Sequence, residues 1–158
     1  PNTEACKAVG VDGFIKVDEA VTLFAGLTWT QYSSNEKLGV DEGTAFSGLI
    51  ADVDLNWSDQ LNYRVAGEYG ISDKTKLRAG YVLTTQVTSS DNPSPSLASP
   101  GFGNTLSFGA GFDCAEGKTM DIGFDYSFAS GDISEPFNGA PNGDYESRSY
   151  SLHASYNF

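Results

Sequence analysis

The feature that most constrains this chain is a two-residue alternation of side-chain character, which is clearest in its last stretch. From Tyr150 to Phe158 every second residue is apolar or aromatic, and the residues between them are polar. The apolar set is Tyr150, Leu152, Ala154, Tyr156 and Phe158. Because successive side chains of a strand point to opposite faces, this pattern predicts a β-strand with one apolar and one polar face.

The same alternation recurs in six earlier segments, although the first alternates less cleanly and Phe24 breaks the rule in the second. These segments are 7–16, 21–30, 61–71, 77–87, 105–114 and 120–128. The 18 glycines and the many Thr, Ser, Tyr and Phe residues fit strands, whereas strong helix formers are scarce. The sequence therefore predicts an all-β chain.

The connections between these segments alternate in length. Short turns are expected at 17–20, 72–75 and 115–118, and long polar connections at about 34–59, 88–103 and 130–144. Short turns at one end and long extracellular loops at the other are typical of an outer-membrane barrel, whose strands show only alternating hydrophobicity. We therefore predict that residues 1–158 form one antiparallel transmembrane β-barrel domain of the bacterial outer membrane, or the C-terminal segment of one.

The number of strands leaves two interpretations open. Seven strands are clear, residues 49–57 are ambiguous, and bacterial single-chain barrels have even strand numbers. The apolar parity of 51–57 matches that of Leu61 and Tyr63, which favours one long strand or a loop extension over a separate strand. Either the chain closes alone with eight strands, or an upstream half is missing. A soluble β-sandwich also alternates, but aromatic residues at strand ends favour a membrane interface.

Several sequence blocks resemble the FadL-type outer-membrane transporters, which carry long-chain fatty acids and aromatic hydrocarbons. The blocks lie in the same order as in that family. They are Thr28-Trp29-Thr30-Gln31-Tyr32-Ser33, Asn56-Trp57-Ser58-Asp59, Arg64-Val65-Ala66-Gly67-Glu68-Tyr69, Leu77-Arg78-Ala79-Gly80-Tyr81 and Ala154-Ser155-Tyr156-Asn157-Phe158. Tyr32 stands where the family has a second Trp.

This resemblance implies that the chain is the C-terminal half of a barrel of fourteen strands, whose plug and laterally open strand lie in the other half. It also implies passive uptake of hydrophobic molecules, captured at the extracellular loops, passed to an inner pocket and released through the barrel wall. The partners implied are a hydrophobic ligand, outer-membrane lipid or detergent, and the barrel-assembly machinery. The alternatives are a small closed barrel with a structural or adhesion role, and a general porin.

Two sets of residues are candidate functional sites. The last strand resembles the signal that the barrel-assembly machinery reads, in Tyr150, Leu152, Tyr156 and Phe158; the alternative is an ordinary amphipathic strand. The predicted polar face carries the candidate ligand-binding residues Arg64, Glu68, Arg78 and His153. Arg64 or Arg78 suits a ligand carboxylate. The favoured alternative is structural, because charges on such a face are expected to pair across neighbouring strands.

Other function classes find no support in the sequence. The net charge of −12 excludes the basic stripe that nucleic acid needs. His153 is the only histidine, and no nucleophile elbow or metal-binding pair occurs, so we expect neither an enzyme nor a cofactor. The acidic run 52–59 lacks the glycine and the final glutamate of a calcium loop. Cys6 and Cys114 alone form no disulfide framework.

Overall fold

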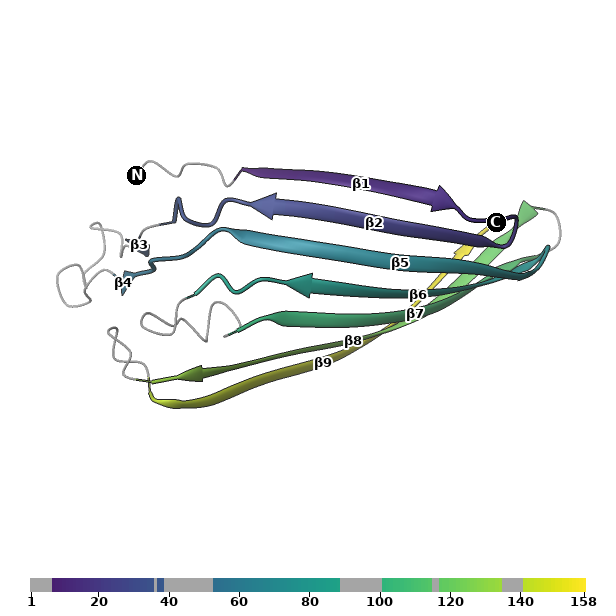
Figure 1. Cartoon of the computed structure of the whole chain (residues 1–158). Coiled ribbons are helices and arrows are strands. Elements are labelled where there is room, and N and C mark those ends of the chain that lie inside the picture. The colour runs from purple at the N-terminus through teal and green to yellow at the C-terminus, as the bar shows by residue number, and fades with distance from the viewer. Residues whose placement is uncertain (1–6, 36, 39–52, 89–100, 115–116, 135–140) are drawn as a thin grey trace.

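Seven antiparallel strands form a single curved sheet (Figure 1) in the computed structural model, which describes residues 7–35, 37–38, 53–88, 101–114, 117–134 and 141–158. The strands are β1 (Ala8–Lys16), β2 (Val21–Thr30), β5 (Gln60–Ser72), β6 (Thr75–Thr84), β7 (Gly103–Asp113), β8 (Thr119–Ile133) and β9 (Gly143–Asn157). Each strand pairs with the next one in this order. The prediction of an all-β antiparallel chain with seven clear strands is confirmed.

The sheet is open in the part of the chain that the structure describes. The strand order runs from β1 to β9, and no pairing joins these two outer strands. The strand ends that flank the short connections lie at one end of the sheet, and those that flank the long connections lie at the other (Figure 1). At the first short turn Asp18 accepts hydrogen bonds from the backbone N–H groups of Ala20 and Val21, at 2.8 and 2.7 Å. This carboxylate closes the turn by satisfying two donors that the strands leave unpaired.

A separate two-stranded hairpin corrects one expectation. β3 (Lys37–Leu38) pairs with β4 (Val53–Asp54), and β5 begins only at Gln60. Within the described part of 49–57, the interpretation as one long strand continuing into the next is therefore wrong. The physical reason lies at Asn56, whose φ of 46° is left-handed and interrupts an extended backbone. Pairing also reaches further than predicted at the third long connection, because Ile133 pairs with Gly143.

The register confirms that the sheet has two faces of opposite character. Along one row Val11, Leu27, Tyr63 and Leu83 face one another across four strands. One residue further, the row is Asp12, Gly26, Arg64 and Val82. We call these the apolar face and the polar face. Because the side-chain period is two, one register fixes the faces of the whole sheet.

Most large apolar side chains are exposed rather than packed in a core. Leu152 is 84% exposed and Phe158 96%. Among the described residues the buried ones are few, namely Leu55, Val87, Thr88, Gly111, Ala129 and Ile133. An apolar surface of this extent is stable only when an apolar medium or another protein surface covers it. Among the described residues, no helix is long and apolar enough to cross a membrane.

Candidate functional site

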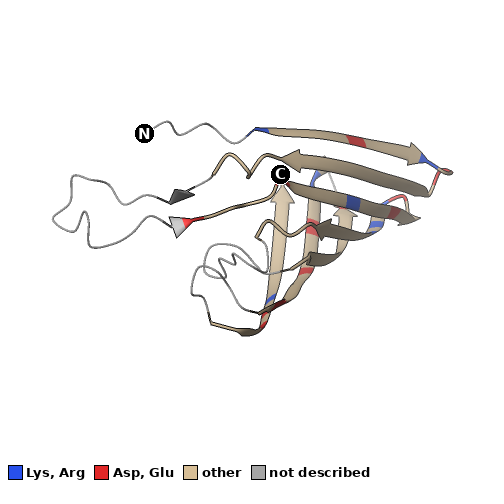
Figure 2. Cartoon of the chain, turned by 60° about the vertical axis from the view of Figure 1, so that its left-hand side comes forward, with Lys and Arg blue, Asp and Glu red and all other residues tan. Residues whose placement is uncertain are grey.

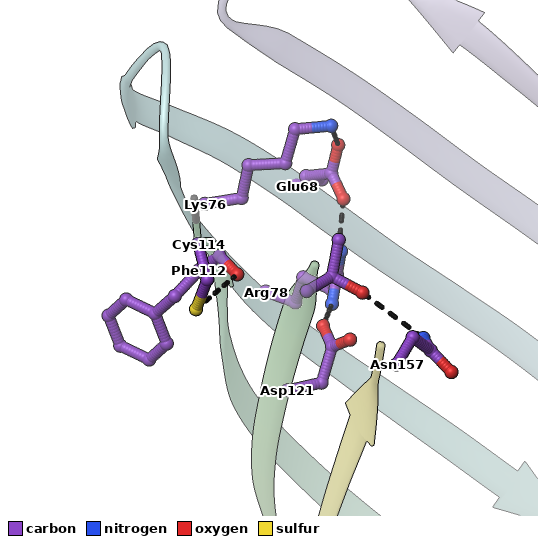
Figure 3. Close-up of polar contacts among 8 residues, drawn as sticks. Glu68, Lys76, Arg78, Phe112, Cys114, Asp121 and Asn157 are labelled. Atoms are coloured by element: carbon purple, nitrogen blue, oxygen red, sulfur yellow. Dashed lines mark hydrogen bonds and ion pairs between the residues drawn. The ribbon is translucent and has the colours of Figure 1, made fainter. Parts of the chain in front are cut away.

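The polar face carries a charged cluster at the short-turn side of the sheet, formed by Glu68, Lys76, Arg78 and Asp121 (Figure 3). Glu68 and Arg78 are direct partners between β5 and β6, and their charged atoms lie 2.8 Å apart. Lys76 Nζ lies 3.1 Å from the second oxygen of Glu68. Arg78 also donates from Nη1 to Asp121 of β8. One guanidinium therefore joins three strands through two carboxylates.

Arg78 reaches a carboxylate two strands away because the strand between them carries glycine. Arg78 lies opposite Gly109 on β7, and the next polar-face position toward the short turn is Gly111, opposite Asp121. A Cβ atom at Gly111 would lie 2.8 Å from Asp121 Oδ1 and 3.2 Å from both Nη atoms of Arg78. The ion pair therefore occupies the space that a side chain at position 111 would fill.

Arg64 repeats this arrangement nearer the long connections. Its Nη2 lies 2.8 Å from Asp12 Oδ1 on β1 and donates to Thr28 Oγ1 at 2.8 Å. The strand between them again carries glycine, here Gly26. The difference is exposure, since the side chains of Arg64 and Asp12 are 38% and 68% exposed. This ion pair is therefore open to solvent and weaker than a buried one.

His153 lies against glycine in the same way. A Cβ atom at Gly123, its partner on β8, would lie within 2.0 Å of the imidazole Nε2. The imidazole Nδ1 lies 3.5 Å from Asp125 Oδ2. The ring therefore lies over Gly123 and beside the Asp125 carboxylate.

All four predicted ligand-binding residues lie on the polar face, and each has a charged partner. Glu68 and Arg78 are brought together in the charged cluster, whereas Arg64 and His153 lie elsewhere on the face. Pairing across strands is thus observed as expected. Figure 2 shows Lys, Arg, Asp and Glu as short separate bands along strands that are otherwise uncharged. Ligand binding by these side chains stays a prediction.

One feature of the polar face was not predicted as a site. Phe14 of β1 and Phe24 of β2 are direct partners, and their ring centroids lie 6.1 Å apart. Their neighbours in the same row on β5 and β6 are Ala66 and Gly80. The signal in the sequence was Phe24, which breaks the alternation of its segment. Its partner was missed because the first segment alternates poorly.

Two of the sequence blocks that resemble the transporter family meet at the long-connection end. Trp29 Nε1 donates to Asp59 Oδ2 at 3.1 Å, and the Ser33 N–H donates to Asp59 Oδ1 at 3.1 Å. Tyr32 packs edge-on against Trp57, with centroids 6.1 Å apart. Hydrogen bonds from Ser33, and to a smaller extent from Trp29, hold the pKa of Asp59 below its ordinary value. We call the Trp29–Ser33–Asp59 contacts the Asp59 clasp.

The apolar face carries the four residues of the predicted assembly signal. Tyr150, Leu152 and Tyr156 lie opposite Tyr126, Phe124 and Met120 of β8, and Phe158 follows β9. Tyr150 stacks on Tyr126 at a centroid distance of 5.0 Å. This arrangement gives β9 a continuous apolar face. Recognition of β9 by the assembly machinery stays a prediction.

Neither a metal site nor a disulfide is found in the described part of the chain. It holds no group of three His, Cys, Asp or Glu residues placed to bind a metal ion. Cys114 is a free, exposed thiol, and its Sγ lies 3.9 Å from the Phe112 carbonyl oxygen (Figure 3). Cys6 lies outside the described residues. The chemistry on which the polar face relies is therefore that of ion pairs, hydroxyls and aromatic rings.

Comparisons with known proteins identify relatives of this chain by sequence and by fold. The family model for outer membrane protein transport proteins (OMPP1/FadL/TodX) matches residues 4–158. A Neisseria meningitidis serogroup B protein described as an outer membrane protein, NMB0088, is 28% identical over 127 residues, which cover 77% of this chain and 27% of that protein. A crystal structure of a Pseudomonas aeruginosa FadL homologue superposes with a TM-score of 0.67 at 18% identity, over 93% of this chain and 33% of that one. The chain thus spans about a third or less of these relatives.

Proposed function

Because the chain belongs to the outer membrane protein transport family (OMPP1/FadL/TodX), we propose that it forms part of a barrel for passive uptake of hydrophobic small molecules such as long-chain fatty acids. Its family places the chain in the bacterial outer membrane. The observation that carries the proposal is the family match over residues 4–158.

The two faces of the sheet support a place in a barrel wall. The apolar face exposes large apolar side chains from every strand of the sheet, which suits contact with lipid hydrocarbon. The polar face pairs its cations with carboxylates, so it suits a hydrated interior in which exposed ion pairs cost little. We assign the polar face to the barrel interior.

We further propose that these seven strands are one side of a larger barrel. Among the described residues β1 and β9 each have one edge without a partner strand. Unpaired backbone N–H and C=O groups are costly in hydrocarbon, which is why membrane sheets close. Both relatives extend well beyond the region that this chain matches, which supports the proposal of further strands.

The test of uptake uses the whole barrel protein that contains these strands, in lipid vesicles. We expect saturable binding of oleate and its transfer across the membrane without an energy source. Absence of saturable binding together with conductance of small ions would instead identify a general porin.

The four residues of the predicted assembly signal, Tyr150, Leu152, Tyr156 and Phe158, are proposed to be recognised by the assembly machinery. Phe158→Ser is expected to lower the amount of folded barrel in the outer membrane.

The larger barrel has its own test. Residues 1–158 alone, refolded in detergent, are expected to aggregate through the open edges of β1 and β9. A monodisperse, heat-resistant monomer would show that the chain closes by itself. That result would favour the small closed barrel with a structural or adhesion role.

A further inference from the structure

We propose that Phe14, Phe24 and Arg64 form a binding site for an amphipathic anion on the polar face, with the rings holding its apolar chain and the guanidinium its carboxylate. This site rests on the proposed uptake of hydrophobic molecules and gives it a location. The argument starts from the two rings, continues with the position of Arg64, and ends with the small residues beside them.

The aromatic pair stands out on a face of mainly small and polar residues. Among the described residues Phe14 is 69% exposed and Phe24 41%, so the sheet itself does not bury either ring. The other positions of this face carry mainly Gly, Ser, Thr and paired charges. Two exposed rings at a centroid distance of 6.1 Å offer a flat apolar surface inside a polar interior. Such a surface gains free energy when an apolar ligand covers it.

Arg64 lies next to this pair because its side chain extends across the sheet. Its Cα is on β5, but its guanidinium extends over Gly26 to Asp12 on β1. A Cβ atom at Gly26 would lie 3.2 Å from the guanidinium Nε. Phe14 and Phe24 are the next polar-face residues after Asp12 on β1 and before Gly26 on β2. A positive charge and two rings therefore occupy neighbouring positions over the same two strands.

The guanidinium keeps donors for a ligand. Its contacts within the described residues, to Asp12 and Thr28, are both made by Nη2. Nε and Nη1 are the two remaining groups, and guanidinium binds carboxylates through pairs of N–H donors. The single acid partner, Asp12, is itself more than half exposed. A carboxylate ligand can thus share or replace Asp12 without leaving a buried charge unpaired.

Small residues beside the rings leave space for a chain. Ala66 and Gly80 continue the row of Phe14 and Phe24 across β5 and β6. On the far side of this row lies the charged cluster of Glu68 and Arg78. An uncharged strip between two charged rows suits an alkyl chain with one anionic end.

The test measures binding of oleate and of oleyl alcohol to the whole barrel protein in detergent. The double variant F14A/F24A is expected to weaken both ligands about tenfold, because both lose the same apolar contacts. R64Q is expected to weaken oleate about tenfold and to leave the alcohol within about twofold, because only the acid uses the charge. The matched controls are F108A, which removes a ring from the apolar face, and R148Q, which removes an exposed arginine of β9.

The outcomes separate this site from the proposed function. Saturable oleate binding that is unchanged in F14A/F24A and R64Q overturns the site and leaves uptake standing. Failure of the unsubstituted protein to bind either ligand overturns uptake itself. Equal losses for acid and alcohol in R64Q would show a structural effect of Arg64, and so would equal losses in R64Q and R148Q. Heat-dependent mobility in each variant checks that the barrel is folded.

Discussion

Arg64 and Arg78 make the same kind of contact across the sheet but have different surroundings. Each extends over a glycine to a carboxylate two strands away, at Gly26 in one case and Gly111 in the other. Arg78 has two acid partners, and Glu68, which it shares with Lys76, is only 19% exposed. Within the described part of the chain, Arg64 has one acid partner, which is largely exposed, and two aromatic rings in the next row. The comparison indicates that Arg78, whose guanidinium has two carboxylate partners, stabilises the sheet, whereas Arg64, with one, keeps donors available to a ligand.

The largest expected effect separates the two arginines by stability. Arg78→Gln leaves Glu68 and Asp121 without their shared cation. It is expected to lower the free energy of unfolding by about 1–2 kcal/mol, which is the worth of hydrogen bonds to charged groups after discounting for partial exposure. Arg64→Gln breaks one exposed ion pair and is expected to cost less than about 1 kcal/mol. Urea unfolding of the whole barrel in lipid measures both. Equal losses of unfolding free energy would remove the distinction between the bridges.

The second prediction exchanges the glycines. At Gly111 a Cβ atom would meet Asp121 and the guanidinium of Arg78, which is held from both sides, so Gly111→Ala is expected to cost about 1 kcal/mol. At Gly26 the closest atom is Oδ1 of Asp12, the end of an exposed side chain at the sheet edge, which can move away. Gly26→Ala is therefore expected to change the stability by less than about 0.5 kcal/mol. A larger loss at Gly26 than at Gly111 contradicts the comparison.

The third prediction tests the counterion of Arg64 alone. Asp12→Asn removes the charge that competes with a ligand carboxylate, so oleate is expected to bind roughly threefold more tightly. Oleyl alcohol, which carries no charge, is expected to bind as before. Asp121→Asn is the matched substitution at the other bridge and is expected to leave both affinities unchanged. Tighter binding of oleyl alcohol in D12N, or equally tighter binding of oleate in D12N and D121N, would show that the carboxylate does not bind at Arg64.

The sequence predicted the strands and faces but not the contacts between alternate strands. Alternation locates each strand, and a period of two fixes which side chains share a face, so the polar placement of Arg64, Glu68 and Arg78 followed directly. Contact between Arg64 and Asp12 depends instead on the register of three strands and on a missing Cβ atom at Gly26. Neither is visible within one segment. The hairpin of β3 and β4 was missed for a related reason, because parity carries no information about the backbone turn at Asn56.

The smallest expected effect concerns the Asp59 clasp at the long-connection end, where the structure is held by hydrogen bonds rather than by ion pairs. Hydrogen bonds from Ser33, and less strongly from Trp29, lower the pKa of Asp59 in the folded protein. A lowered folded pKa means that this carboxylate stabilises the fold above its ordinary pKa in the unfolded chain. The stabilisation is lost as the pH falls through the lowered value. Asp59→Asn removes the charge and keeps one of the two acceptor oxygens. The folded barrel is therefore expected to be more stable than D59N near neutral pH, and this difference should vanish in acid. Urea unfolding of the two proteins across acidic pH measures it, and a difference that does not change with pH would show that the clasp acts through geometry alone.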